Sequence, residues 1–426
     1  MSGNGGQGRI LVIGGGITGM TAAIEASEAG GQVLLVEKNP YLGGRVAGSN
    51  RYFPKLCPPG CGLEINFRRI RTSPRIQCLT LAEVEKITGQ PGRYRASIRR
   101  HPRGVNDKCT ACGACVAACP VERADEFNCR MGSTKAIYLP YDMAYPLRYV
   151  IDAGVCPGGK CGRCVPACPY GAIDLEAKSE TMEVEVAAVI WATGWAPFDA
   201  AAIDGLGFGA YPDVITNAMM ERLASANGPT GGKIRRPSDG GPIDTVVFVQ
   251  CAGSRDENYL KHCSGVCCMA SLKQARYVRE QYPNARIYVF YIDIRAPGRL
   301  EDFYAAAQED DKLTLIKGKV AKITRDAGGG RLVVQAEDTL SGERVSQIAD
   351  LVVLATGMAP VDSAVRLELD AVLQRDEHGF LAAEQPLAGL LAAGCAKRPV
   401  DVASCVRDAT GAALKALQCC REQAGG

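Results

Sequence analysis

The segment Arg9-Ile-Leu-Val-Ile-Gly-Gly-Gly-Ile-Thr-Gly19 decides the fold of the first part of the chain. Its apolar strand run leads through the glycines into an alanine-rich helical pattern, Met20–Ala29, and then into a second strand, Gln32–Glu37. Gly14 permits a tight turn, Gly16 lets the backbone approach a pyrophosphate, and Gly19 allows close helix–strand packing. The pyrophosphate would lie at the positive end of the helix dipole. This order predicts a dinucleotide-binding βαβ unit.

The acidic residue that closes the second strand adds to this prediction. Glu37 lies 18 residues after Gly19, where a carboxylate accepts hydrogen bonds from an adenosine ribose and repels a 2′-phosphate. We therefore expect Gly14, Gly16, Gly19 and Glu37 to hold the adenosine diphosphate half of a bound dinucleotide. Further candidates for cofactor contacts are Gly15, Thr18, Lys38, Gly44, Arg45, Ala192, Thr193, Gly194, Thr356, Gly357 and Gly394.

Two cysteine runs follow, and each ends in Cys-Pro. The first run is Cys109, Cys112, Cys115 and Cys119, and the second is Cys156, Cys161, Cys164 and Cys168. In two-cluster ferredoxins the fourth cysteine of each run ligates the other cluster. We therefore expect one [4Fe–4S] cluster on the first three cysteines of run one with Cys168, and another on the first three of run two with Cys119. The alternatives are zinc or a single cluster.

A second strand–loop–helix–strand unit comes later, in Thr245–Val249, Met269–Gln281 and Arg286–Ile292. The order of elements suggests a pyridine-nucleotide domain, but the loop Gln250–Asp256 lacks the three-glycine fingerprint, so we expect no NAD(P)H binding there. The same region carries Cys251, Cys263, Cys267 and Cys268. For these we favour a third [4Fe–4S] cluster over a set of buried apolar thiols.

The composition bounds the class of protein. The 426 residues are 47% apolar, which excludes disorder, and a net charge of +3 gives no electrostatic case for nucleic acid. The start shows no secretory signal, so we expect the twenty cysteines to be reduced and metal-bound. Apolar stretches such as Ala187–Phe198 are too short to span a membrane. No Ser-His-Asp order or HExxH motif indicates hydrolytic chemistry.

These patterns together predict an α/β protein with an interrupted organisation. We expect an FAD-binding part at 1–100, an inserted ferredoxin-like domain at 101–180, a connecting strand at 181–200, a degenerate NAD(P)-type domain with a cysteine cluster at 201–345, and the last part of the FAD-binding domain at 346–426. The run Val184–Trp191 should form one buried strand. Its ending, Ala192-Thr-Gly194, returns at Ala355-Thr-Gly357.

Several of these motifs resemble the A subunit of the quinone-interacting membrane-bound oxidoreductase complex, a relative of the heterodisulfide reductase A subunit. The resemblance covers nearly the full length. The segments that carry it are Val12–Met20, Gly43-Gly-Arg45, Phe53–Cys61, the insert from Lys108 through Lys135–Tyr138 to Asp174, Gln250–Asp256 with Cys263–Cys268, and Ala393–Lys397. It implies a thioredoxin-reductase-like FAD fold with a ferredoxin insert and a further [4Fe–4S] cluster at Cys251, Cys263, Cys267 and Cys268. The heterodisulfide reductase relatives commonly carry added segments at both ends, which this sequence does not show, and this favours the quinone-linked relative.

The resemblance also implies a function. We expect a cytoplasmic-side electron-transfer subunit, held at the membrane by a partner that supplies the anchor, which relays electrons between the quinone pool and adenylylsulfate reductase in dissimilatory sulfate metabolism. One alternative is a flavin-based bifurcating subunit of heterodisulfide reductase type. An alternative of another class is a scaffold that keeps a degenerate flavin fold and binds structural zinc.

Overall fold

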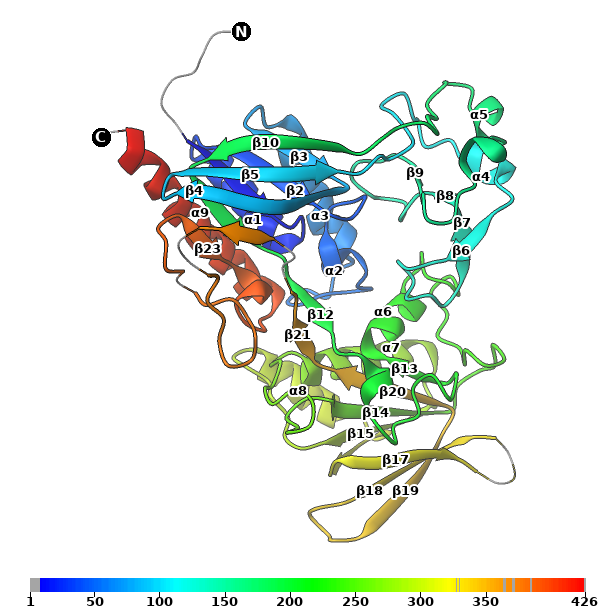
Figure 1. Cartoon of the computed structure of the whole chain (residues 1–426). Helices are drawn as coiled ribbons and strands as arrows, with labels where there is room; N and C mark the ends of the chain where they lie inside the picture. Colours follow the sequence, from blue (N-terminus) through cyan, green and yellow to red (C-terminus); the bar gives the residue numbers. More distant parts are fainter. Residues whose placement is uncertain are drawn as a thin grey trace. The chain divides into compact units, whose positions relative to one another are not determined.

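The computed structural model describes residues 8–326, 328, 330–362, 365–369, 372–383 and 385–424 (Figure 1). Residues 1–7, on which part of the expectation of no secretory signal rests, lie outside this range. The chain divides into two compact units. The first unit comprises Met1–Trp195, Pro360–Arg398 and Val402–Gly426, and the second comprises Ala196–Ala359 and Pro399–Asp401.

The first unit holds a parallel sheet in the order β23-β11-β1-β2-β3 and a second sheet in the order β10-β5-β4-β22. Helices α1, α3 and α9 pack on one face of the parallel sheet. The bounds are β1 (Arg9–Ile13), α1 (Ile17–Glu28), β2 (Gln32–Glu37), α2 (Gly44–Ala47), α3 (Pro59–Thr72), β3 (Ile76–Thr80), β4 (Ala82–Gln90), β5 (Arg93–Arg100), β10 (Glu180–Val186), β11 (Ala188–Trp191), β22 (Arg366–Glu368), β23 (Leu390–Ala392), η3 (Gly394–Ala396) and α9 (Val402–Ala424).

The first unit has three layers because the side chains of the parallel sheet alternate between two cores. Ile10 and Val12 of β1 pack with residues of α1, α3 and α9. Leu11 and Ile13, which point to the other face, pack with the β4-β5-β10 sheet. Strands buried on both faces read as continuous apolar runs, and this is why Arg9–Ile13 carries no polar alternation.

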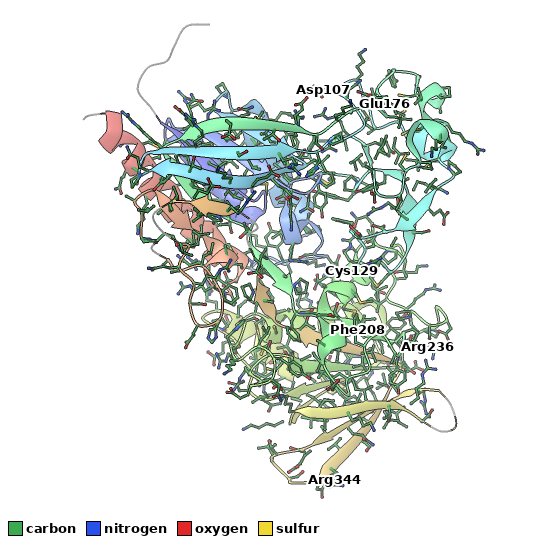
Figure 2. All side chains as sticks on the ribbon, viewed as in Figure 1. Asp107, Cys129, Glu176, Phe208, Arg236 and Arg344 are labelled. Atoms are coloured by element: carbon green, nitrogen blue, oxygen red, sulfur yellow. The ribbon has the colours of Figure 1, made fainter. Side chains whose placement is uncertain are left out.

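The chain leaves the β4-β5-β10 sheet after β5 and returns to it at β10, and the insert lies between these strands. Its elements are α4 (Ala114–Ala118), β6 (Glu122–Ala124), β7 (Ser133–Lys135), β8 (Ile137–Tyr138), β9 (Val150–Ile151), η1 (Gly158–Lys160) and α5 (Cys164–Ala167). The two ends of the insert lie side by side, because the Asp174 N–H donates to Gly104 O (3.0 Å) and Val105 bridges to Ile173. Asp107 and Glu176 mark these ends in Figure 2.

The second unit is built on a parallel sheet in the order β13-β20-β14-β15-β16, and one face of it packs on an antiparallel sheet, β17-β18-β19. Strands β12 and β21 pair with each other where the chain passes from one unit to the other. The bounds are β12 (Trp195–Pro197), η2 (Ala200–Ala202), β13 (Val214–Thr216), α6 (Asn217–Ala224), β14 (Thr245–Ala252), α7 (Cys267–Gln281), β15 (Arg286–Tyr291), α8 (Leu300–Gln308), β16 (Leu313–Lys317), β17 (Val320–Arg325), β18 (Leu332–Glu337), β19 (Arg344–Ala349), β20 (Leu351–Thr356) and β21 (Met358–Pro360).

The structure differs from the sequence expectation in two places. The run Val184–Trp191 is two strands rather than one, because the chain passes from the antiparallel sheet (β10) to the parallel sheet (β11) at Ala187, whose N–H donates to Arg9 O (2.7 Å). Residues 346–359 lie in the second unit, because β20 pairs with β13 and β14.

Candidate flavin and iron–sulfur sites

The predicted glycine loop lies between β1 and α1, and its glycines are in close contact with backbone. A Cβ on Gly14 would lie 2.4 Å from Ala192 O, and one on Gly19 would lie 1.8 Å from Gly14 O. Gly14 also has φ +107°, which L side chains rarely adopt. No residue other than glycine fits either place without movement of the backbone. Because Gly14 contacts Ala192, the predicted Ala192–Gly194 turn lies next to the glycine loop.

The first turn of α1 has the features of an anion site. The helix is 12 residues long and its N-cap is Gly16, and no side chain of the described residues caps its first N–H groups. A Cβ on Gly16 would have only Gly44 Cα near it, at 3.9 Å, so the space in front of the loop is open. Uncapped N–H groups at a positive helix end suit a pyrophosphate. The loop therefore fits the diphosphate of FAD.

Glu37 is buried at the end of β2 and faces this loop. Its carboxylate accepts hydrogen bonds from the Gly15 N–H (2.5 Å) and from the backbone and side-chain N–H groups of Asn39 (2.7 Å each). Burial raises the pKa of Glu37, although these hydrogen bonds act in the opposite direction. Glu37 thus holds the loop itself, a role that the sequence did not suggest, and a ribose hydroxyl would be an additional partner. The neighbouring Lys38 is exposed.

The Gly43-Gly44-Arg45 turn packs on the glycine loop. The Gly43 N–H donates to Gly15 O (2.8 Å), and a Cβ on Gly44 would lie 2.9 Å from Gly16 Cα. The Arg45 Nε donates to Trp195 O (2.8 Å), and its guanidinium lies over the Trp195 ring. These contacts bring Gly44 together with Gly15 and Gly16, two other predicted residues.

Gly394 lies against the first turn of α1. A Cβ there would lie 2.2 Å from Thr18 Oγ1, so Gly394 and Thr18 are adjacent, as two candidates for one site should be. The Gly394 N–H donates to Asp408 Oδ2 on α9 (2.7 Å), so this N–H is already used within the protein. Asp408, which also pairs with Lys397, carries no motif that could have revealed it.

Thr356 and Gly357 belong to the second unit, at the end of β20. Thr356 O accepts from Cys267 Sγ (3.7 Å), and a Cβ on Gly357 would lie 2.0 Å from Ser254 Oγ. The near repeat of Ala192-Thr-Gly194 therefore marks a similar strand ending in each unit. In the second unit this ending contacts the cysteine-bearing loop.

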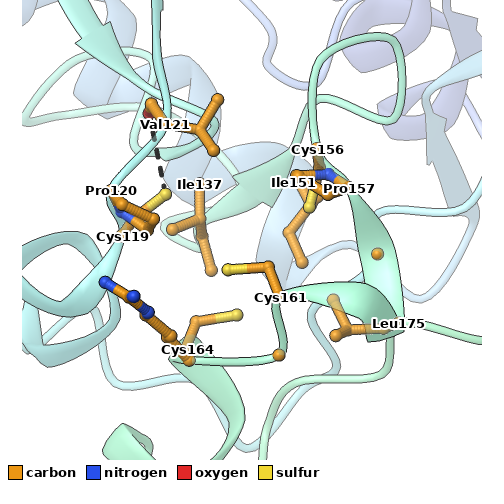
Figure 3. A pocket seen from close by; sticks show the side chains of 13 residues that line it. Cys119, Pro120, Val121, Ile137, Ile151, Cys156, Pro157, Cys161, Cys164 and Leu175 are labelled. Atoms are coloured by element: carbon orange, nitrogen blue, oxygen red, sulfur yellow. Dashed lines mark hydrogen bonds between the residues drawn. The ribbon is translucent and has the colours of Figure 1, made fainter.

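The two cysteine runs of the insert contribute to two cavities. Cys119 lines the first cavity, of about 330 Å³ counting space open to solvent, together with Cys156, Cys161 and Cys164 (Figure 3). Cys168 lines the second, of about 290 Å³, together with Cys109, Cys112 and Cys115. Each cavity thus gathers three cysteines of one run and the fourth of the other. Ile137, Ile151 and Leu175 supply apolar walls to the first cavity.

The pKa shifts of the thiols agree with this grouping. Burial raises the pKa of Cys115 to about 11, and Cys109 and Cys168 act in the same direction. Burial likewise raises the pKa of Cys164, with Cys156, Cys119 and Cys161 adding to the shift. Crowded thiolates repel each other, and bound iron would remove that cost because a cation favours the thiolate form. The donor sets therefore fit iron–sulfur clusters. Within the described ranges, no three His, Cys, Asp or Glu side chains are grouped as around a single metal ion.

A third group of cysteines lies in the second unit. Cys251 is the next-to-last residue of β14 and has a positive φ of 56°, Cys263 lies in the following loop, and Cys267 and Cys268 are the first two residues of α7. Burial is the largest of the causes that raise the pKa of the Cys267 thiol. The nearby thiols of Cys268, Cys251 and Cys263 raise this pKa further, so the four thiols are close enough to interact. The start of a 15-residue helix favours negative charge, as a cluster with four thiolates would carry.

Comparisons with known proteins match the regions of the glycine loop and of the two cysteine runs of the insert. A model of FAD dependent oxidoreductases matches residues 9–54, and models of 4Fe-4S binding domains match residues 104–122 and 160–171. The iron-sulfur A subunit of CoB--CoM heterodisulfide reductase from Methanocaldococcus jannaschii is 40% identical over 95% of this chain and 63% of its own length. The A subunit of the ferredoxin/F(420)H(2)-dependent CoB-CoM heterodisulfide reductase from Methanosarcina acetivorans is 38% identical over 96% of the chain and 53% of its own.

The chain is homologous to heterodisulfide reductase A subunits over about 95% of its own length. It carries FAD and iron–sulfur sites, as predicted, and it spans between about half and two thirds of the length of these two relatives. The names of those relatives support the heterodisulfide reductase alternative better than the quinone-linked interpretation. No helix in the described part of the chain combines the length and apolar character that crossing a membrane requires.

Solved structures confirm the predicted fold class. Thioredoxin reductase from Lactococcus lactis has a TM-score of 0.54 at 13% identity, and the alignment covers 98% of this chain and 100% of that one. Thioredoxin reductase from T. acidophilum has a TM-score of 0.52 at 14% identity, covering 96% of this chain and 97% of that one. At such identities the likeness concerns the fold alone.

Proposed function

We propose that this chain is an electron-transfer subunit of a heterodisulfide reductase type of oxidoreductase, in which FAD exchanges electron pairs and [4Fe–4S] clusters pass single electrons. The observation that carries the proposal is the crossed arrangement of two four-cysteine cavities in the same compact unit as the dinucleotide loop. The protein's part is to bind, orient and insulate these groups. Gly14, Gly16, Gly19 and Glu37 hold the adenosine diphosphate half of FAD.

The cysteines supply the ligands in this proposal. One cluster takes Cys109, Cys112, Cys115 and Cys168, and the second takes Cys119, Cys156, Cys161 and Cys164. A third takes Cys251, Cys263, Cys267 and Cys268, and occupies the loop in which a nicotinamide domain would bind its pyrophosphate. The candidate residues Thr356 and Gly357 border this third site, where Thr356 O contacts Cys267.

Anaerobic purification followed by cofactor analysis tests the proposal. We expect one FAD per chain, a broad iron–sulfur absorption and about twelve irons if all three sites are filled. Dithionite should bleach both chromophores, while NADH alone, without accessory subunits, should not. A folded, metal-free and colourless preparation would refute the proposal, and zinc in place of iron would support the scaffold alternative.

A second candidate is flavin-based bifurcation. One relative, from Methanothermobacter marburgensis and 35% identical, is named as an A subunit of an H(2):CoB-CoM heterodisulfide,ferredoxin reductase, a name with two acceptors. Bifurcation requires strongly crossed one-electron flavin potentials, and simple relay does not. Spectroelectrochemistry of the flavin separates the two.

The partners form a finer proposal. Other subunits of a heterodisulfide reductase-like complex are the first expectation, since the relatives are named as subunits. A membrane anchor, peripheral attachment to the cytoplasmic side, and electron flow between quinone and adenylylsulfate reductase rest on the resemblance of the motifs alone. Proteins that copurify with the tagged chain distinguish these two sets of partners.

A further inference from the structure

We infer that Arg103 is a positioning residue that fixes the separation between the iron–sulfur cavities of the insert and the dinucleotide loop. The inference rests on the proposed function, because it concerns electron transfer between those sites. All contacts that support it lie in the first unit.

The guanidinium of Arg103 joins the insert to the turn that follows β2. Its Nη2 donates to Pro40 O (2.5 Å) and to Thr80 Oγ1 at the end of β3 (2.9 Å), and its Nη1 donates to Arg148 O in the insert (3.3 Å). Three acceptors on three separate segments use the fork geometry of a guanidinium, which a single ammonium group cannot reproduce. The Arg103 side chain thus bonds both to the insert and to the part of the first unit that contains β2 and β3.

The backbone of Arg103 is tied to the cavities. Its carbonyl accepts from the Ile151 N–H (3.0 Å), and Ile151 lines the cavity of Cys119, Cys156, Cys161 and Cys164. Two residues further along, Val105 lines the other cavity. A displacement of Arg103 would therefore be transmitted to the walls of both candidate cluster sites.

The turn held by Arg103 is in turn bonded to the dinucleotide loop. Tyr141 of the insert donates its hydroxyl to Leu42 O (3.1 Å), and the Leu42 N–H donates to Tyr145 O (2.9 Å). Leu42 is fully buried, and a Cβ on Gly15 would lie 2.4 Å from its Cδ2. The next residue, Gly43, bonds to Gly15 O. A continuous series of short contacts therefore runs from the cluster cavities to the dinucleotide loop.

Aromatic packing stiffens the same junction. Phe127 stacks on Tyr141 with ring centroids 4.8 Å apart, and the Tyr41 ring meets both edge-on at 5.7 and 5.4 Å. Two of these rings come from the insert and one from the turn. The packing should keep the junction assembled when Arg103 is replaced, so that a substitution shifts the cofactors without losing them.

Arg103→Met, which keeps an apolar stem and removes all three guanidinium bonds, is the test variant, with Arg103→Lys as the conservative one. Arg95→Met is the matched control, because Arg95 lies on β5 and pairs with Glu185 on the surface. After rapid reduction of the clusters with dithionite, the rate of flavin bleaching is measured. The enhancement of the flavin's electron spin relaxation by the reduced clusters is measured as well, since it depends on distance and not on turnover.

We expect Arg103→Met to keep its FAD and iron but to lose part of the relaxation enhancement. Its flavin should bleach at least about tenfold more slowly than the flavin of the wild type. Arg103→Lys should give values between those of Arg103→Met and the wild type. Should Arg103→Met fail to fold, Tyr141→Phe removes only the bond to Leu42 and should show a smaller change of the same sign. Equal rates and equal relaxation in Arg103→Met, Arg95→Met and the wild type would overturn the inference. A wild-type protein without any flavin–cluster coupling would instead contradict the proposed function.

Discussion

Cys119 ends the first cysteine run, yet it lines the same cavity as Cys161 of the second run. Cys168 is related to Cys109 in the same way. The crossing follows from the topology of the insert, where α4 and α5 pack together and each run continues past its own helix toward the opposite cavity.

This crossing predicts which pairs of cysteines share a cluster. With crossed ligands, Cys119→Ala combined with Cys156→Ala damages one cluster and should remove about four irons, whereas Cys119→Ala combined with Cys112→Ala damages two and should remove about eight. Iron analysis and EPR of the reduced proteins measure this. Uncrossed pairing would reverse the two results.

The cysteine group of the second unit gives a separate prediction. Replacing Cys268 with alanine should remove about four irons and leave the FAD content unchanged, because the dinucleotide loop belongs to the other unit. Cys420→Ala is the control, since Cys420 is a buried thiol on α9 outside the three groups. If Cys268→Ala keeps its full iron content, the four cysteines are only buried thiols.

Replacing a helical glycine with alanine should have opposite effects on stability at Gly19 and at Gly411. A Cβ on Gly19 would collide with Gly14 O, so Gly19→Ala should lower the free energy of unfolding by about 1–3 kcal/mol and weaken FAD binding. Gly411 on α9 has open space around it, so Gly411→Ala should raise the free energy of unfolding by about 0.5–1 kcal/mol. Denaturant unfolding and FAD titration measure both. Equal effects of the two substitutions would contradict the packing argument.

Local features of this fold could be predicted from the sequence, whereas features that depend on long-range contacts could not. The βαβ unit was predictable because Arg9–Ile13 and the glycine spacing are local patterns, and β1 and β2 have the predicted bounds. The division of Val184–Trp191 between two sheets was not, because both halves are apolar and only long-range pairing distinguishes them. Arg103 and Asp408 carry no motif, since their roles depend on acceptors and donors far away in the sequence. Spacing identified the cysteines, but long-range contacts link the insert to the loop.

The buried carboxylate of Glu37 gives the last prediction, which concerns pH. Because burial raises its pKa in the folded protein above the usual value near 4.5, folding favours the protonated form. The contribution of Glu37 to stability is therefore fully present below about pH 4.5 and is lost as the pH rises through the raised pKa. In the FAD-free protein, Glu37→Gln should flatten this part of the stability–pH curve, as measured by denaturant unfolding across the pH range.

The same substitution, Glu37→Gln, should weaken the binding of FAD. A glutamine side chain at this position would offer only one acceptor oxygen where the carboxylate offers two, and it has no charge, so a ribose hydrogen bond would weaken by about 1.5–3 kcal/mol, or tenfold to a hundredfold in the FAD dissociation constant. Glu64→Gln, at an exposed position of α3, is the control and should change neither quantity. A Glu37→Gln protein that binds FAD as tightly as the wild type would show that Glu37 serves only the glycine loop, through the Gly15 N–H.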